Sequence, residues 1–201
     1  ALRAKREKTD AEYLTWTWSE YRAQIHSVAK SLMACGLKQH DAINILAFNA
    51  PEWFFTAMGG VWAGGLTAGI YITNSPPAVQ YILNHSKCKV MFVDTEDQLA
   101  KVLEVRAQAP NLVKIVAFPF GNISESTITS TPDLLSWAAF LEMGTATSDS
   151  ELQTRIASMY PDNACYLSYT SGTTGQPKAV MYSHDNILYG EPGCRVSPLN
   201  R

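Results

Sequence analysis

Apolar runs of about six residues alternate with longer, helix-like segments through most of this chain, and this alternation limits the fold more than any other feature. The apolar runs predict strands over residues 42–47, 66–72, 89–93, 112–118 and 164–169. The segments between the first four runs have the length of helical crossovers, which join neighbouring parallel strands. The sequence therefore predicts an α/β fold with a mostly parallel sheet and flanking helices.

Residues that begin or end helices stand where this alternation requires them. Thr17 and Glu20 fit a capping box, in which each side chain accepts a hydrogen bond from the other residue's backbone amide. Gly36 supplies the left-handed residue after that helix, and Pro51 fits the first turn of the next one, where no amide hydrogen is needed. Further helices are predicted over residues 75–83 and 95–108.

The pattern weakens at the N-terminus and in one internal segment. Residues 1–15 show no clear periodicity, and their basic run is interpreted as part of a solvated, frayed end. Residues 121–150 are rich in Ser and Thr and contain one short helical stretch at 132–141. We interpret this internal segment as a surface excursion.

One stretch is long and apolar enough to suggest a membrane span. Residues 53–72 carry no charge over about twenty positions. Gly64 and Gly65 divide the stretch, and its second half is a short run that ends in Tyr71 and Ile72. A buried helix followed by a buried parallel strand explains this composition better, so no transmembrane span is predicted.

Charge and cysteine content exclude several classes of protein. The formal net charge of −2 gives no reason to expect a nucleic-acid partner. The four cysteines have neither the C-x-x-C spacing of a zinc or redox site nor the density of a disulfide framework. Because the first residues also lack an apolar secretory region, we expect a reducing, cytoplasmic location. No metal site is predicted from the residues of the chain.

The most informative segment is the polar loop between the apolar run at 164–169 and a short strand predicted at 179–182. Gly172 and Gly175 allow positive φ, which turns backbone amides toward one point, and Lys178 adds a positive charge. Thr and Ser hydroxyls complete a cradle suited to a polyanion such as a nucleotide triphosphate. The candidate phosphate-binding residues are Thr170, Ser171, Gly172, Thr173, Thr174, Gly175 and Lys178.

This loop differs from a Walker A motif, because Pro177 precedes the lysine and a strand rather than a helix follows. A flexible Ser/Thr/Gly linker is the alternative, but such linkers rarely carry this ordered pattern between two apolar runs. Ser183 is expected to cap a helix after the second strand. His184 is a candidate general base, because imidazole titrates near neutral pH, but we prefer a packing role for it at the helix start.

Residues 170–178 resemble the phosphate-binding signature of the adenylate-forming superfamily, which holds acyl-CoA synthetases, luciferases and peptide-synthetase adenylation domains. Four segments look like the bubblegum-type long-chain acyl-CoA synthetases: TWTWSEYRAQIHSVAKSLMACGL, FNAPEWFFTAMGGVWAGG, GIYITNSPPAVQYIL and YTSGTTGQPKAVMYSHDNI. The loop is specific to the superfamily, whereas the assignment to this branch depends on the whole pattern. Ala179 departs from the usual Pro-Lys-Gly-Val, and its Cβ is expected to strain close backbone packing.

The resemblance implies an AMP-forming ligase that activates a long-chain fatty acid. The carboxylate attacks the α-phosphate of ATP to give acyl-AMP and pyrophosphate, and the thiol of CoA then displaces AMP to form acyl-CoA. Mg²⁺ is expected to bridge the ATP phosphates, and the loop is expected to stabilise the β- and γ-phosphates electrostatically. A lipid substrate also fits peripheral contact with the cytosolic face of a membrane.

The resemblance further implies that residues 1–201 form part of the large N-terminal AMP-binding domain, with the phosphate-loop segment at 164–186. The family's adenine pocket, acidic Mg²⁺ ligand and C-terminal domain with the adenylation lysine have no counterpart before the tail at 190–201. A sheet interrupted after Tyr182 is expected to leave an unpaired edge and exposed apolar surface. Two alternatives stay open: a catalytically inactive, truncated isoform that binds nucleotide or a partner, and another adenylate-forming ligase, such as an aryl-acid ligase or a luciferase-like enzyme.

Overall fold

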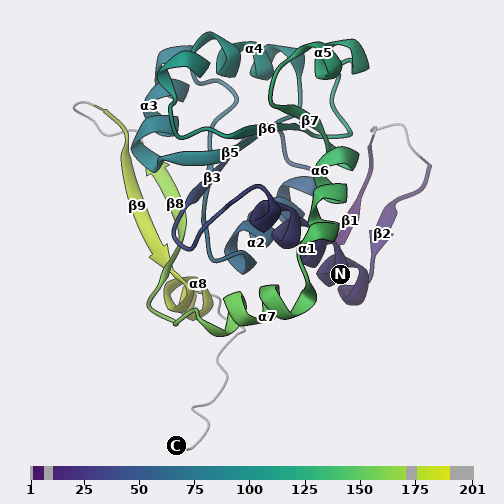
Figure 1. Ribbon diagram of the computed structural model, residues 1–201, viewed down its shortest axis with the longest axis vertical. Helices are drawn as coiled ribbons and strands as arrows, with labels where there is room; N and C mark the ends of the chain where they lie inside the picture. The colour runs from purple at the N-terminus through teal and green to yellow at the C-terminus, as the bar shows by residue number, and fades with distance from the viewer. Residues whose placement is uncertain (1, 7–10, 171–175, 191–201) are drawn as a thin grey trace, which may run out of the picture.

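A seven-stranded sheet forms the centre of the computed structural model, which describes residues 2–6, 11–170 and 176–190 (Figure 1). In sheet order the strands are β7 (Leu134–Ser136), β6 (Lys114–Ala117), β5 (Cys88–Val93), β3 (Ala42–Leu46), β4 (Leu66–Gly69), β8 (Ala164–Thr170) and β9 (Lys178–Ser183). Every neighbouring pair is parallel except β8 and β9. The predicted mostly parallel sheet is therefore confirmed.

Helices cover both faces of this sheet (Figure 1). They are α1 (Trp18–Ala34), α2 (Pro51–Trp62), α3 (Pro76–Ser86), α4 (Glu96–Glu104), α5 (Glu125–Ser130), α6 (Trp137–Met143), α7 (Asp149–Ala157) and α8 (His184–Gly190). The described residues also contain two 3-10 segments, η1 (Arg106–Gln108) and η2 (Gly144–Ala146). One apolar cluster joins α1, α2 and α6 to the sheet, and another joins α3 and α4 to the opposite face.

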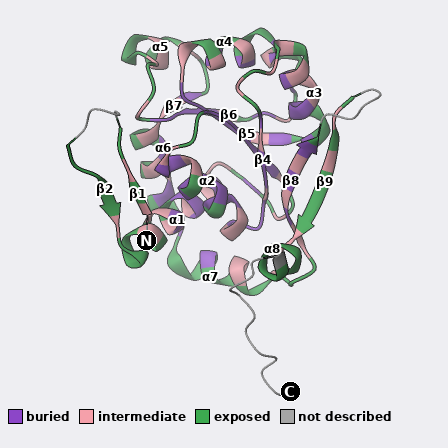
Figure 2. Cartoon of the chain, turned by 180° about the vertical axis from the view of Figure 1, so that it is seen from behind, coloured by how far each residue is buried: buried purple, intermediate pink, exposed green. Residues whose placement is uncertain are grey.

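Alternate residues of the central strands enter these two clusters. In β5, Val90 and Phe92 belong to the α1–α2 side, whereas Met91 and Val93 belong to the α3–α4 side. All four are fully buried, which explains the near-continuous apolar strands of the sequence. Figure 2 shows the buried residues concentrated along the sheet and on the inner sides of the helices.

The helix boundaries follow the local signals of the sequence. The side chains of Thr17 and Glu20 form both hydrogen bonds of the predicted capping box at the start of α1. Gly36 has a φ of 85° directly after that helix, and Pro51 is the first residue of α2. Helix α2 and strand β4 together account for the apolar stretch at 53–72. Among the described residues, no helix has the length and apolar character needed to cross a membrane.

The N-terminal residues differ from the expected frayed end. Strands β1 (Leu2–Ala4) and β2 (Leu14–Trp16) pair as an antiparallel ribbon. The ring of Trp16 packs edge-on against Phe55 of α2, with 5.7 Å between ring centroids. Since Phe55 is buried in the α1–α2 cluster, this contact ties the ribbon to the domain core.

The segment 121–150 also holds more structure than a surface excursion would. Its strand β7 extends the sheet beyond β6, and Phe140 of α6 is fully buried against Phe92 of β5. The strand is only three residues long, and the Ser and Thr residues of the neighbouring helix caps make the surrounding sequence look polar. This part of the chain is therefore built into one end of the sheet and onto the α1–α2 face.

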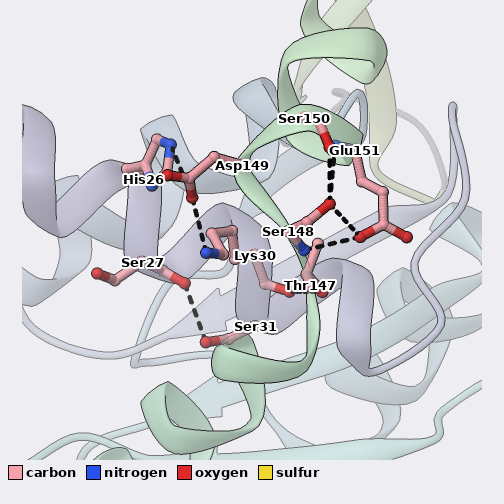
Figure 3. Close-up of polar contacts among 9 residues, drawn as sticks. All are labelled: His26, Ser27, Lys30, Ser31, Thr147, Ser148, Asp149, Ser150 and Glu151. Atoms are coloured by element: carbon pink, nitrogen blue, oxygen red, sulfur yellow. Dashed lines mark hydrogen bonds and ion pairs between the residues drawn. The ribbon is translucent and has the colours of Figure 1, made fainter.

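Polar contacts hold the end of this segment against α1 (Figure 3). The Thr147 hydroxyl donates a hydrogen bond to the carbonyl oxygen of Lys30 at 3.1 Å, and the Lys30 ammonium donates to Asp149 at 2.8 Å. Ser148 and Glu151 form a capping box at the start of α7. These contacts fix the start of α7 against α1, and the chain then returns to the sheet as β8.

Candidate nucleotide-binding site

The predicted phosphate loop connects β8 and β9. Strand β8 lies parallel to β4 on one side and antiparallel to β9 on the other. Thr170 and Lys178 face each other where the loop begins and ends, and the Thr170 hydroxyl approaches the Lys178 carbonyl oxygen at 3.5 Å. The loop therefore leaves the sheet at the carboxyl end of β8, the edge at which open α/β sheets bind ligands.

The structure describes two of the seven candidate phosphate-binding residues. Thr170 and Lys178 are both exposed and are brought together by the strand pairing. None of the carboxylates in the described part of the chain forms an ion pair with Lys178. The remaining candidates, Ser171, Gly172, Thr173, Thr174 and Gly175, lie outside the described residues.

Ala179 takes part in regular strand pairing at the base of the loop. The residue lies inside β9, pairs with Tyr169 and is not among the described non-glycine residues with positive φ. Its half-buried methyl group packs against the α3–α4 cluster. An alanine at this position therefore adds an apolar contact to the base of the hairpin.

A pocket of about 320 Å³ opens at the same edge of the sheet. Residues that follow β3, residues at and after the end of β4, residues of β8 and one side chain of α2 line it: Ala47, Phe48, Asn49, Trp53, Gly69, Ile70, Tyr71, Ile72, Tyr166, Ser168 and Tyr169. Trp53 and Trp62 pack against the core, but Trp53 also lines this pocket with Tyr71, which is 72% exposed.

Two tyrosines of β8 keep their hydroxyl protons at neutral pH. Burial raises the pKa of Tyr166, and burial likewise raises the pKa of Tyr169 to about 12. Both residues line the pocket, and neither adds negative charge beside the start of the loop. Their protonated hydroxyls act as hydrogen-bond donors.

Asp94 orders one rim of the pocket, and sequence reasoning missed it. This residue follows β5, is 5% exposed, and accepts a hydrogen bond through Oδ2 from the backbone N–H of Phe48 at 2.8 Å. Its other oxygen, Oδ1, is buried with no hydrogen-bond partner among the described residues. An acidic residue directly after a buried strand was the available signal, because it falls at the carboxyl edge of the sheet.

Helix α3 contacts both ends of the candidate loop. The Tyr81 hydroxyl donates a hydrogen bond to the carbonyl oxygen of Pro177 at 2.9 Å. Nδ1 of His85 lies 3.0 Å from the hydroxyl oxygen of Tyr169. His85 lies four residues after Tyr81 in α3, and this spacing puts both side chains on one helix face. Nothing in the linear sequence indicated that this face meets the loop.

His184 is half-buried at the start of α8, and burial lowers its pKa. The Ser183 hydroxyl accepts a hydrogen bond from the backbone N–H of Asn186 at 3.1 Å, which confirms the predicted cap. In the described structure the imidazole forms no ion pair with a carboxylate. These features agree with a packing role for His184.

The parallel sheet, the polar loop at its carboxyl edge and the adjoining pocket define an α/β protein of the nucleotide-binding class. The chain belongs to the AMP-binding enzyme family, whose family model matches residues 2–197.

Curated relatives agree with this assignment. The chain is 40% identical over 173 residues to the long-chain-fatty-acid–CoA ligase ACSBG1 of Homo sapiens, covering 86% of this chain and 23% of that protein. It is 38% identical to ACSBG2 of Xenopus laevis, with the same coverage, and 37% identical to ACSBG1 of Bos taurus, covering 92% of this chain and 26% of that protein. The chain therefore spans about a quarter of the length of these relatives.

Solved structures share the fold. The A domain of carboxylic acid reductase from Segniliparus rugosus, in complex with AMP, matches with a TM-score of 0.72 at 15% identity, covering 88% of this chain and 30% of that one. The anthranilate CoA ligase AuaEII, in complex with anthranoyl-AMP, matches with a TM-score of 0.68 at 24% identity, covering 83% of this chain and 29% of that one. A fatty acyl CoA synthetase of Mycobacterium tuberculosis matches with a TM-score of 0.61 at 21% identity, covering 85% of this chain and 30% of that one.

Proposed function

We propose that this chain is the nucleotide-binding part of an ATP-dependent long-chain fatty acid–CoA ligase. The observation that carries the proposal is the 37–40% identity to named long-chain-fatty-acid–CoA ligases over most of this chain. In the proposed reaction a fatty acid and ATP give acyl-AMP and pyrophosphate, and CoA then yields acyl-CoA and AMP. The remaining catalytic parts, including the adenylation lysine, are proposed to lie outside these 201 residues.

Within that reaction the segment from Thr170 to Lys178 is proposed to bind the β- and γ-phosphates of ATP. Support comes from its position between two paired strands at the carboxyl edge of the sheet. The Lys178 ammonium supplies positive charge, and the Thr170 hydroxyl supplies a donor at the opposite strand end. Fixed donors of this kind stabilise the charge of transferring phosphate groups without covalent chemistry.

The pocket beside Thr170 is proposed to receive an uncharged part of the same complex. Its aromatic lining and its protonated tyrosines suit a ring or an acyl segment better than a phosphate. A volume of about 320 Å³ is at the small end for a ligand pocket, so a whole long acyl chain requires further space.

Mg²⁺ enters the proposal as the counter-ion of the ATP phosphates. Across the described ranges, His, Cys, Asp and Glu residues form no group of three or more able to hold a metal ion. The described residues therefore do not fit a metal site of their own. Its acidic protein ligand is proposed to belong to the other parts of the enzyme.

We further propose a cytoplasmic location with peripheral contact at membranes that supply the fatty acid. The described cysteines, Cys35, Cys88 and Cys165, are all free thiols, which fits a reducing compartment. No nucleic acid is expected as a partner, since the net charge is −2.

The test combines ATP binding by calorimetry with a thioester assay using palmitate, Mg²⁺ and CoA. The present chain is measured beside a full-length ligase that contains it, and each is compared with its Lys178→Ala variant. We expect this chain to bind ATP without turnover, and we expect Lys178→Ala to weaken binding by about tenfold in both proteins.

The possible outcomes separate the alternatives. Thioester formation by the 201-residue chain would show that these residues suffice for catalysis. An unchanged ATP affinity and rate in full-length Lys178→Ala would refute the assigned phosphate contact. An acyl-CoA profile restricted to aryl acids in the full-length protein would favour another adenylate-forming ligase.

A further inference from the structure

The two contacts of α3 with the candidate loop come from one face of that helix. Tyr81 and His85 are four residues apart, and their rings stack with 5.4 Å between centroids. Tyr81 reaches the carbonyl oxygen of Pro177, and His85 reaches the hydroxyl of Tyr169. Tyr169 directly precedes Thr170, and Pro177 directly precedes Lys178.

We propose that Tyr81 and His85 are positioning residues that fix the two ends of the phosphate loop relative to the sheet. We call this pair of contacts the α3 anchor. The inference rests on the proposed phosphate-binding function, which gives the fixed ends their purpose. Neither residue is proposed to touch the nucleotide.

The chemistry of each contact suits a fixed geometry. The Tyr81 hydroxyl is a donor and the Pro177 carbonyl an acceptor, so this hydrogen bond has a defined direction. In the neutral tautomer of His85 that carries its proton on Nε2, the Tyr169 hydroxyl donates to Nδ1. The rings of His85 and Tyr169 also meet edge-on, with 5.7 Å between centroids. Two hydrogen bonds and one ring contact from α3 thus converge on the loop ends.

The anchor connects the loop to a firm part of the fold. Val79, Ile82 and Leu83 of α3 are buried in the α3–α4 cluster, so the helix itself is held by the core. Strand β9 has β8 as its sheet neighbour and lies at the end of the sheet order. The contact to Pro177 therefore gives the β9 side of the loop a second attachment besides β8.

Positioning matters because phosphate binding by a loop depends on donors held in place before the ligand arrives. When the binding groups are already ordered in the free protein, less conformational entropy is lost on binding. Loosening either loop end should therefore weaken the affinity for ATP and for inorganic tripolyphosphate, while leaving the chemistry of the donor groups unchanged.

The test uses Tyr81→Phe, which removes one hydroxyl and keeps the ring, and two substitutions of His85. His85→Phe keeps a ring but loses the acceptor, whereas His85→Asn keeps an oxygen near the position of Nδ1. The matched control is Tyr160→Phe, because Tyr160 is 69% exposed and lies outside the anchor. Each variant is first checked by urea unfolding, so that only folded proteins are compared.

Two measurements are made on the full 201-residue chain. One is the dissociation constant for ATP and for tripolyphosphate in the presence of Mg²⁺, and the other is amide hydrogen exchange at Thr170 and Lys178 without ligand. We expect Tyr81→Phe and His85→Phe each to weaken binding by about three- to tenfold and to speed exchange at both amides. His85→Asn should lie closer to the wild type than His85→Phe, and Tyr160→Phe should match the wild type.

The exchange measurement separates failure of the anchor from failure of the proposed function. If the wild-type chain binds neither ATP nor tripolyphosphate, the proposed function of this chain fails, and faster exchange in Tyr81→Phe still supports the anchor. Unchanged exchange in folded Tyr81→Phe and His85→Phe overturns the anchor, whether or not the wild type binds. Equal effects of His85→Asn and His85→Phe would overturn the role of the acceptor atom.

Discussion

The guanidinium group of Arg6 and the carboxylate of Glu52 form an ion pair between the N-terminal ribbon and the first turn of α2. The two residues are 46 positions apart, and one of their hydrogen bonds measures 2.9 Å. Glu52 is only 5% exposed, and the Arg6 guanidinium also lies over the ring of Phe120 at 5.5 Å. A carboxylate buried at a helix start therefore has its charge compensated by a residue from outside the sheet.

Arg6→Ala should destabilise the protein by about 1–3 kcal/mol. The substitution leaves the Glu52 carboxylate buried without its partner, but Arg6 is itself about a third exposed, so solvent screens part of the loss. Urea unfolding at pH 7 measures the change. A loss below about 0.5 kcal/mol would show that the pair behaves like an ordinary surface ion pair.

Two further variants separate the charge from the side-chain packing. Adding Glu52→Gln to Arg6→Ala should recover part of the stability, because the neutral amide costs less to bury than an unpaired carboxylate. Arg22→Ala, which removes an exposed arginine stacked on Trp62, should cost about 0.5 kcal/mol.

Gly121→Ala should destabilise the protein by more than about 2 kcal/mol. A Cβ at this position would overlap the carbonyl oxygen of Asp94, which also accepts a hydrogen bond from Asn122. Because backbone cannot rotate away as a flexible side chain does, the chain after β6 has to shift. The shift should also disturb the Asp94 contact that holds Phe48 at the pocket rim.

The comparison for this variant is Gly36→Ala. Gly36 has a φ of 85°, but nothing lies within 4 Å of an added Cβ. Its substitution should cost about 1–2 kcal/mol from backbone strain alone. If thermal unfolding gave Gly36→Ala the larger effect, steric overlap at Gly121 would not be the dominant cost.

Features that depend on neighbours along the chain were predictable from the sequence. The capping box of Thr17 and Glu20, the helix start at Pro51 and the alternation of β3, α2 and β4 all depend on short sequence separations. The phosphate-binding chemistry of the loop remains a prediction from residue types, and the position of the loop at the carboxyl edge of the sheet follows from the fold.

Features that depend on distant partners were not predictable in this way. Strand β7 has only three residues, too few to show a period of two, and it is recognisable only through its pairing with β6. Phe140 is fully buried against Phe92 of β5, although the wider segment at 121–150 is rich in Ser and Thr. The bond from Tyr81 to Pro177 spans 96 residues and has no local signature.

Asp149→Asn should reduce the dependence of stability on acid pH. The hydrogen bond from Lys30 lowers the pKa of Asp149, and the charges of Lys30 and His26 lower it further (Figure 3). A carboxyl group with a lowered pKa in the folded state stabilises the protein above its unfolded pKa of about 4, and this contribution is lost as pH falls through the folded value.

The urea midpoints of wild type and Asp149→Asn should therefore differ between pH 5 and 7 and converge as pH falls below about 4. Raising the salt concentration should shrink the difference at pH 7, because Asp149 is exposed. Asp162→Asn, which removes an exposed carboxylate outside this ion pair, serves as the control. A wild-type advantage that stayed constant from pH 7 to pH 3 would mean that the carboxylate charge is not its source.

Met181→Lys should reduce self-association of the isolated 201-residue chain. Among the described strands, β9 ends the sheet with a single strand neighbour, and it exposes Val180, Met181 and Tyr182 at 42%, 67% and 39%. An edge strand with free backbone groups and apolar side chains pairs readily with another copy, and a central lysine opposes that pairing. We expect the wild-type chain to show concentration-dependent association in sedimentation velocity, and Met181→Lys to remain monomeric over the same range.

Leu103→Lys is the control. It places the same charge on an exposed apolar position of α4, which is 38% exposed and lies away from the sheet edge. An equal loss of association in both variants would assign the effect to net charge, whereas a loss confined to Met181→Lys would locate association at the β9 edge.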